Sequence, residues 1–148
     1  MDFALTRGTL LAALVALGCF GPLGPFPDGR LSGRVVTAPV DEWPCAANRV
    51  LELETDPIAP VSVNVHFVSE GSRLWVATVL GGSSDWARRA LADPRVRVRL
   101  CNDVYERGAV RVTERSEIEH VAALYREKYT ITPDVADDGA LVFRLEPR

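Results

Sequence analysis

The feature that most constrains the fold of this chain is an uninterrupted alternation of apolar and polar residues over positions 61–67. A period of two puts one kind of residue on each face of an extended strand, which is typical of an antiparallel sheet with one buried face. Glu70 and Gly71 then provide a turn, and Arg73 to Thr78 return as a second strand rich in β-branched and aromatic residues. These two segments are therefore predicted to form a β-hairpin.

Further short segments with strand-like patterns surround this hairpin. They lie at residues 34–37, 50–54, 95–100, 104–112 and 140–145. Two helices are expected between strands, and no internal repeat is present. Mostly antiparallel strands with two helices predict a small closed or nearly closed sheet with helices on its rim.

Both helices have recognisable starts and ends. The first is expected to begin with Ser83 or Ser84 as its N-cap and to stop at Asp93–Pro94. The second opens on the pattern Ser116–Glu119, a capping box in which Ser116 is the N-cap and the glutamate reaches back. Its apolar stripe predicts an end near Lys128 or Tyr129.

The strand at 104–112 contains a conflict between its two faces. A tight turn is expected at Asn102–Asp103. If the strand continued without interruption, Val110 and Val112 would lie on the face that carries arginines. A bulge at Gly108 shifts the register by one residue and returns both valines to the core, so we predict that bulge.

Arginines recur along this hairpin and just beyond it. They are Arg95, Arg97, Arg99, Arg107, Arg111 and Arg115. We expect them to form the solvent face of an antiparallel pair, with Glu106 opposite Arg99; a face for an anionic ligand or for lipid headgroups is the alternative. Nucleic acid is not an expected partner, because the net charge is −3 and no aromatic residues are interleaved among the arginines.

The first nineteen residues resemble a bacterial lipoprotein export signal. Arg7 gives a basic start, and residues 9–17 are apolar but shorter than the roughly 20 residues that span a bilayer. Ala16-Leu17-Gly18-Cys19 resembles a lipobox. We expect lipid on Cys19 and export to the periplasmic side of the cell envelope; the alternatives are an uncleaved anchor, an ordinary signal peptide cut elsewhere or a mistranslated start.

The sequence predicts three segments in the chain. Residues after Cys19 are dense in glycine and proline, which disfavour regular structure. We expect residues 1–18 to form the signal peptide, residues 19–33 a tether and residues 34–148 one small domain. The hydrophobic content of 47% is ordinary for a globular protein.

The remaining cysteines leave a question open. Cys45 and Cys101 could pair in an oxidising compartment, but we expect two separate buried thiols. Neither cysteine belongs to a C-x-x-C motif. Because His66 and His120 lie far apart in sequence, no metal site is expected.

A family resemblance emerges between Arg73 and Val112. This stretch combines a strand, a short helix with Trp86, the phrase Ala92-Asp93-Pro94-Arg95-Val96-Arg97-Val98 and a hairpin strand. The helix at 117–129 then precedes a closing strand. This order resembles the pyridoxamine 5'-phosphate oxidase-like superfamily, which includes FMN-binding oxidases and deazaflavin-dependent reductases. The resemblance covers roughly residues 34–148 and implies a small antiparallel split β-barrel, mainly β with two helices, that forms a homodimer.

The resemblance also implies a cofactor site. In that superfamily the flavin phosphate lies near the end of the strand before the short helix and at the start of this helix. Carried over to this sequence, the positions are Thr78, Gly82, Ser83, Ser84, Arg88 and Arg89. Backbone amides and hydroxyls there suit an anion. The structural alternative is a glycine turn, a serine cap, a core tryptophan and a solvated arginine pair.

Two functions remain open from the sequence. One is a lipid-anchored, exported oxidoreductase that binds FMN or a deazaflavin, in which the cofactor carries the chemistry. The other is a non-catalytic envelope lipoprotein that binds no cofactor and keeps the barrel as a module for a small ligand or a protein. No G-x-S-x-G hydrolase motif is present, and no catalytic residue is assigned.

Overall fold

A computed structural model describes residues 28–130 and 134–148 of the chain. The predicted signal peptide and Cys19 lie outside these residues. The strands are β1 (Arg34–Val36), β2 (Val50–Thr55), β3 (Val61–Glu70), β4 (Arg73–Thr78), β5 (Arg95–Leu100), β6 (Asp103–Arg111) and β7 (Leu141–Pro147). The helical segments are the 3-10 turn η1 (Gly81–Ser83) and the helices α1 (Asp85–Ala92) and α2 (Arg115–Lys128).

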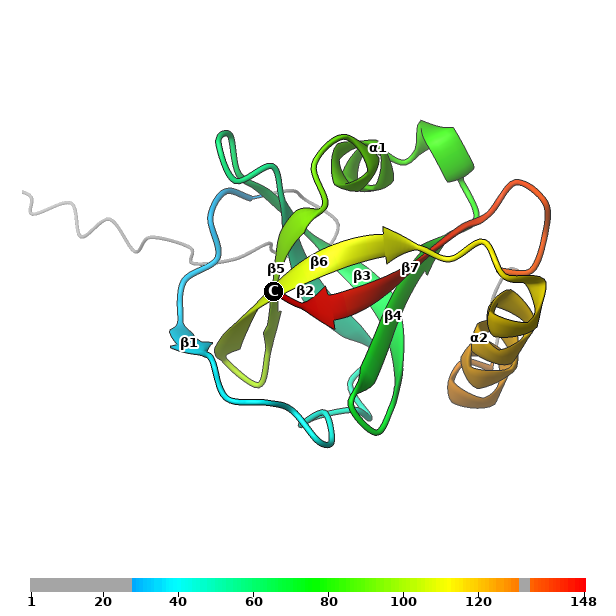
Figure 1. The fold of residues 1–148 in the computed structure, drawn as a ribbon, viewed down its shortest axis with the longest axis horizontal. Coiled ribbons are helices and arrows are strands. Elements are labelled where there is room, and N and C mark those ends of the chain that lie inside the picture. Colours follow the sequence, from blue (N-terminus) through cyan, green and yellow to red (C-terminus); the bar gives the residue numbers. More distant parts are fainter. Residues whose placement is uncertain (1–27, 131–133) are drawn as a thin grey trace, which may run out of the picture.

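Six of the seven described strands form a closed antiparallel barrel (Figure 1). The strands are hydrogen-bonded in the order β6-β5-β2-β3-β4-β7, and β7 pairs again with β6 to close the ring. The short strand β1 lies outside this ring and pairs with β6 in parallel. The prediction of a mainly β fold with two helices and a small antiparallel barrel is confirmed.

The barrel interior is filled by the apolar residues that alternate along its strands. Phe67 of β3 and Val76 of β4 are fully buried and lie opposite each other in the ladder, which confirms the predicted hairpin. Phe143 of β7 belongs to the same core. Burial of each such side chain contributes roughly 1.5–3 kcal/mol, so this interior is the main source of stability.

Helix α2 covers part of the outer barrel surface and buries a second apolar cluster there. Val121 and Tyr125 of the helix share this cluster with Trp75 of β4. The Tyr125 hydroxyl donates to the carbonyl oxygen of His66 at 2.9 Å, which ties the helix to β3. The helix ends at Lys128, as predicted. No helix within the described ranges is both long and apolar enough to cross a membrane.

The start of α2 differs from the prediction. The N-cap residue is Glu114, so the predicted capping box with Ser116 as N-cap is wrong. Glu119 accepts a hydrogen bond from the Arg115 side chain at 2.9 Å instead of reaching back. Glu117 binds the guanidinium of Arg144 at 2.7 Å, and this tertiary contact fixes the first turn of the helix without a side-chain cap.

The hairpin of β5 and β6 turns one residue earlier than predicted. Its turn residues are Cys101 and Asn102, whose φ angles are 52° and 66°. Two successive positive φ values are typical of the two-residue turn whose twist matches that of the strands. As a result Glu106 lies opposite Arg97 and not opposite Arg99.

Strand β6 passes through Gly108 without a bulge, so that prediction is wrong. Its pairing with β7 runs without interruption from Arg107 to Arg111, and its pairing with β5 runs without interruption from Asp103 to Gly108. The outer face is also partly buried here, because Val112, just after the strand, packs in the cluster beneath α2. Val110 remains 38% exposed on that face. The inner face instead accommodates a buried arginine, Arg107.

Arg97 and Arg99 of β5 are not on a solvated face, contrary to the expectation, whereas Arg95, Arg111 and Arg115 are exposed as predicted. Residues 28–33, the end of the predicted tether, pack beside Arg97 and Arg99, and Leu31 is 1% exposed. The Arg97 side chain donates to the Leu31 carbonyl oxygen at 3.0 Å and to the Glu54 carboxylate at 3.1 Å. That carboxylate, itself buried, also accepts the Leu31 amide at 2.6 Å. The ion pair is therefore held inside a contact between β2, β5 and the N-terminal segment.

Cys45 and Cys101 form a disulfide, with their Cα atoms 6.1 Å apart. The bond ties the long segment between β1 and β2 to the turn between β5 and β6. The expectation of two separate buried thiols is wrong, since both residues are paired and exposed. Barrel closure brings together positions that are 56 residues apart in the sequence.

Candidate functional site

The predicted cofactor positions gather where β4 leaves the barrel and α1 begins. Thr78 is the last residue of β4, η1 contains Gly82 and Ser83, and Ser84 is the N-cap of α1. Gly81 has φ of 52°, and a Cβ atom there would collide with the carbonyl oxygen of Gly139. Only glycine allows this close approach, which holds the turn against the loop before β7.

The polar groups of this turn are partly engaged. The Thr78 hydroxyl oxygen accepts the Leu80 amide at 3.1 Å. Ser84 is buried, and its side chain makes no capping bond to α1. No heavy atom lies within 4 Å of the position that a Cβ atom on Gly82 would take. The first-turn amides of α1 therefore have no side-chain cap, and the backbone beside them is open, which suits an anionic ligand.

The two predicted arginines are not available as free charges. Arg88 donates to the Asp85 carboxylate at 2.8 Å, and Arg89 reaches the same carboxylate at 2.8 Å and Asp56 at 3.3 Å. Hydrogen bonds from Arg89 and Arg88 lower the pKa of Asp85. Two guanidinium groups and two carboxylates therefore form a neutral set. Asp85 lies three and four residues before the arginines, and this helical spacing is the sequence signal for the pairing.

Several apolar side chains of this turn and of α1 are exposed or half-buried. Val79 and Leu80 are 37% and 66% exposed, and Leu91 on α1 is 47% exposed. Trp86 is half-buried, with its ring centroid 5.6 Å from that of Phe143 in the core. Exposed apolar groups of this size favour contact with a planar ligand or with another protein surface.

The backbone donors and exposed apolar side chains of this turn fit different parts of a flavin or deazaflavin. The planar ring system of such a cofactor fits the exposed apolar side chains. An anionic group of the cofactor finds backbone donors beside Gly82 and at the start of α1, but neither Arg88 nor Arg89 supplies an unpaired charge. The turn thus fits the cofactor through its backbone and apolar surface.

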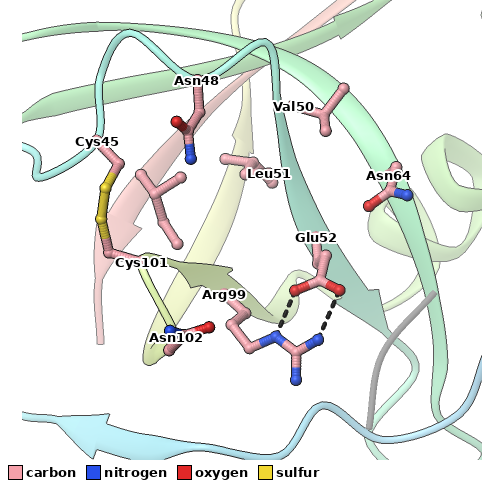
Figure 2. A pocket seen from close by; sticks show the side chains of 10 residues that line it. Cys45, Asn48, Val50, Leu51, Glu52, Asn64, Arg99, Cys101 and Asn102 are labelled. Carbon is pink, nitrogen blue, oxygen red and sulfur yellow. Dashed lines mark hydrogen bonds and ion pairs between the residues drawn. A yellow bond between two sulfur atoms is a disulfide. The ribbon is translucent and has the colours of Figure 1, made fainter. Parts of the chain in front are cut away.

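A second hollow, of about 500 Å³, was not foreseen from the sequence (Figure 2). The disulfide lies on one side of it, and the side chains of Glu52 and Arg99 point toward each other on the other side. Arg99 donates to Glu52 at 2.6 Å and to the Ser32 carbonyl oxygen at 3.0 Å. The two charged side chains that line this hollow are therefore paired with each other. Among residues 28–130 and 134–148, no three His, Cys, Asp or Glu side chains converge as metal ligands.

Comparison with known proteins identifies the fold. No protein-family description matches the chain, and no curated protein matches it. Several solved structures, by contrast, match the chain.

A candidate pyridoxamine 5'-phosphate oxidase from Listeria innocua is 14% identical, with a TM-score of 0.54 over 68% of this chain and 85% of that one. An FAD-binding protein from Mesorhizobium loti is 18% identical, with a TM-score of 0.50 over 70% and 83%. An F420-H2 dependent reductase is 22% identical, with a TM-score of 0.54 over 67% and 95%. The chain therefore has the split-barrel fold of pyridoxamine 5'-phosphate oxidase-like proteins.

Proposed function

We propose that this chain is an exported, lipid-anchored split-barrel protein that binds FMN or a deazaflavin at the turn between β4 and α1 and acts as an oxidoreductase. The observation that carries the proposal is the juxtaposition of open backbone at Gly82 with the exposed side chains of Val79 and Leu80. Neighbours of the same fold that are described as FAD-binding and as an F420-H2 dependent reductase support this class of ligand.

The chain's own residues have binding and positioning roles in this proposal. The backbone at Gly82 and the hydroxyls of Ser83 and Ser84 would hold the anionic end of the cofactor, while Thr78 fixes the turn through its bond to the Leu80 amide. The exposed apolar side chains of Val79 and Leu80 would contact the ring system of the cofactor and exclude water from it. A bound flavin or deazaflavin supplies the electron or hydride transfer.

Export is proposed on two grounds. Disulfides persist mainly in oxidising compartments, so the bond between Cys45 and Cys101 supports a location outside the cytoplasm. The lipobox-like sequence ending at Cys19 supports attachment to the membrane through lipid. A radioactive lipid precursor should label the wild-type chain and not the Cys19→Ala variant. Equal labelling of both would contradict the anchor.

A homodimer is proposed as the functional unit. The exposed side chains of Leu80 and Leu91 would be covered by a second protomer, which would complete the cofactor site. Sedimentation equilibrium of the full chain in a density-matched detergent tests this, and replacement of both leucines by serine should shift a dimer toward monomer. A wild-type monomer at all concentrations would contradict it.

The second candidate is the non-catalytic envelope lipoprotein. The pairing of Arg88 and Arg89 with Asp85 and Asp56 favours it, because neither of these two guanidinium groups is free to attract a phosphate at this turn. In this alternative the barrel binds a small ligand or another envelope protein.

One experiment separates the two functions. The full chain, purified in mild detergent, is titrated with FMN and with a deazaflavin while cofactor fluorescence is recorded. The proposal predicts saturable binding that Gly82→Leu abolishes without lowering the Tm, because that position is open. Gly29→Leu is the matched control, since its position is equally open and should leave binding unchanged. No saturable binding at micromolar cofactor, or unchanged binding by Gly82→Leu, would reject the cofactor site.

A further inference from the structure

A buried arginine occupies the inside of the barrel, away from the turn discussed above. Arg107 of β6 is 6% exposed and lies on the same face of the strand as Tyr105. Its guanidinium carbon is 5.0 Å from the ring centroid of Trp43 and 5.5 Å from that of Tyr105. The Trp43 ring is itself fixed, because its Nε1 donates to the Ser72 carbonyl oxygen at 3.0 Å. The guanidinium is thus held in place by two aromatic rings.

The hydrogen bonding of Arg107 is incomplete. One terminal nitrogen donates to the Glu106 carbonyl oxygen at 2.8 Å, but the buried Nε has no acceptor. Within the part of the chain that the structure describes, no carboxylate forms an ion pair with Arg107. Burial of the Arg107 guanidinium lowers its pKa, because a charged group loses hydration inside the protein. The aromatic rings offset part of this cost, yet a buried charge without a carboxylate or full hydrogen bonding is costly.

The arginine lines a hollow of about 420 Å³ at this end of the barrel, a volume within the usual range for small-ligand sites. Much of the wall is apolar. It includes Pro39, Val40, Leu145 and Pro147. Arg73, Arg144 and Glu146 also line the hollow; Arg73 pairs with Glu70, and Arg144 pairs with both Glu117 and Glu146. Arg107 is therefore the wall residue whose positive charge has no carboxylate partner among the described residues.

We propose that this hollow binds a small organic monocarboxylate, whose carboxylate pairs with Arg107 and whose apolar body lies against Val40 and Pro147. A guanidinium presents parallel donors that match the two oxygens of a carboxylate. The single guanidinium without a carboxylate partner matches the two oxygens of one carboxylate, and Glu146, which also lines the hollow, disfavours a phosphate dianion. The apolar wall favours an aromatic or aliphatic acid over an inorganic anion.

This site is separate from the proposed cofactor site. Figure 1 shows α1 above one end of the barrel, whereas the segment between β1 and β2, which carries Pro39, Val40 and Trp43, crosses the opposite end. The inference therefore does not depend on the proposed function, and failure of either leaves the other intact.

The test is thermal unfolding of the full chain in mild detergent with increasing sodium benzoate at constant ionic strength. Benzoate should raise the Tm saturably by several degrees, acetate should need at least a roughly tenfold higher concentration, and phosphate should have no saturable effect. Arg107→Met should lose the benzoate response, because it removes the guanidinium that would bind the carboxylate. It should keep or raise the Tm without ligand, because it removes a buried charge that lacks a carboxylate partner and keeps an apolar side chain against Trp43 and Tyr105. Arg73→Met, whose charge is matched, is the control that should keep the response.

A second variant keeps the proposal testable if Arg107→Met does not fold. Val40→Glu places a carboxylate in the hollow, where it should pair with Arg107 and weaken benzoate binding at least tenfold. The proposal is overturned if benzoate gives no saturable shift, if phosphate acts at the same concentration as benzoate, or if both Arg107→Met and Val40→Glu retain the wild-type response.

Discussion

The disulfide provides the sharpest stability prediction. Cys45 and Cys101 are 56 residues apart in sequence, so their bond closes a long loop in the unfolded chain. In the chain-entropy model, such a loop loses roughly 14 cal/mol/K, which corresponds to about 4 kcal/mol at 25 °C. We expect the variant with serine at both positions to lose about 2–4 kcal/mol of unfolding free energy, since measured values tend to fall below the model.

Equilibrium urea unfolding of the full chain measures this loss. Each single serine variant should lose as much as the double variant, because either substitution removes the same bond. Reductant should destabilise the wild type and leave the double variant unchanged. A double variant within about 0.5 kcal/mol of wild type, or the same mass after alkylation with and without prior reduction, would contradict the disulfide prediction.

Three further predictions concern single side chains. Glu54→Ala should lower the unfolding free energy by about 3 kcal/mol in urea titrations, because it leaves Arg97 largely buried without its carboxylate; a loss below about 1 kcal/mol would contradict this. Gly81→Ala should cost roughly 1–3 kcal/mol in the same assay, whereas Gly82→Ala should be nearly neutral; equal effects would contradict the strained turn. Burial lowers the pKa of Lys128 from 10.5 to about 8, so the unfolded chain binds more protons between these values and the unfolding free energy should rise from pH 8 to 10. In pH-dependent urea titrations Lys128→Met should lack this rise, and an identical profile in the variant would contradict it.

Local patterns predicted much of the fold. The alternation at 61–67 identified β3 and its face, because a half-buried strand requires that period wherever it lies in the barrel. The stripe along α2, from Ile118 to Tyr129, similarly identified the face that packs on the barrel. These features depend on neighbouring residues alone.

Contacts between residues far apart in the chain could not be predicted from the sequence. The bulge at Gly108 was predicted on the assumption that only the inner face of β6 is buried, yet α2 also buries Val112 on the outer face. The pairing of Arg97 with Glu54 depends on a strand contact and on the packing of Leu31, and neither can be read from local spacing. The disulfide likewise depends on barrel closure.

The candidate site was predictable only in its position along the chain. Thr78, Ser84 and the glycines between them lie together at one turn because they are close in sequence. The pairing of Arg89 with Asp56 required the fold, since these residues are on different elements. The orientation of Arg107 into the barrel also required the true register of β6.

The most direct test of the proposed function is to locate the cofactor on the chain. Amide NMR spectra of the 15N-labelled full chain in detergent are recorded during titration with FMN and with a deazaflavin. One of these cofactors should cause saturable shifts that are largest for residues 79–87, with no comparable shifts around Arg107 or the disulfide. The absence of saturable shifts with either cofactor, or shifts centred away from the turn between β4 and α1, would contradict the proposed function.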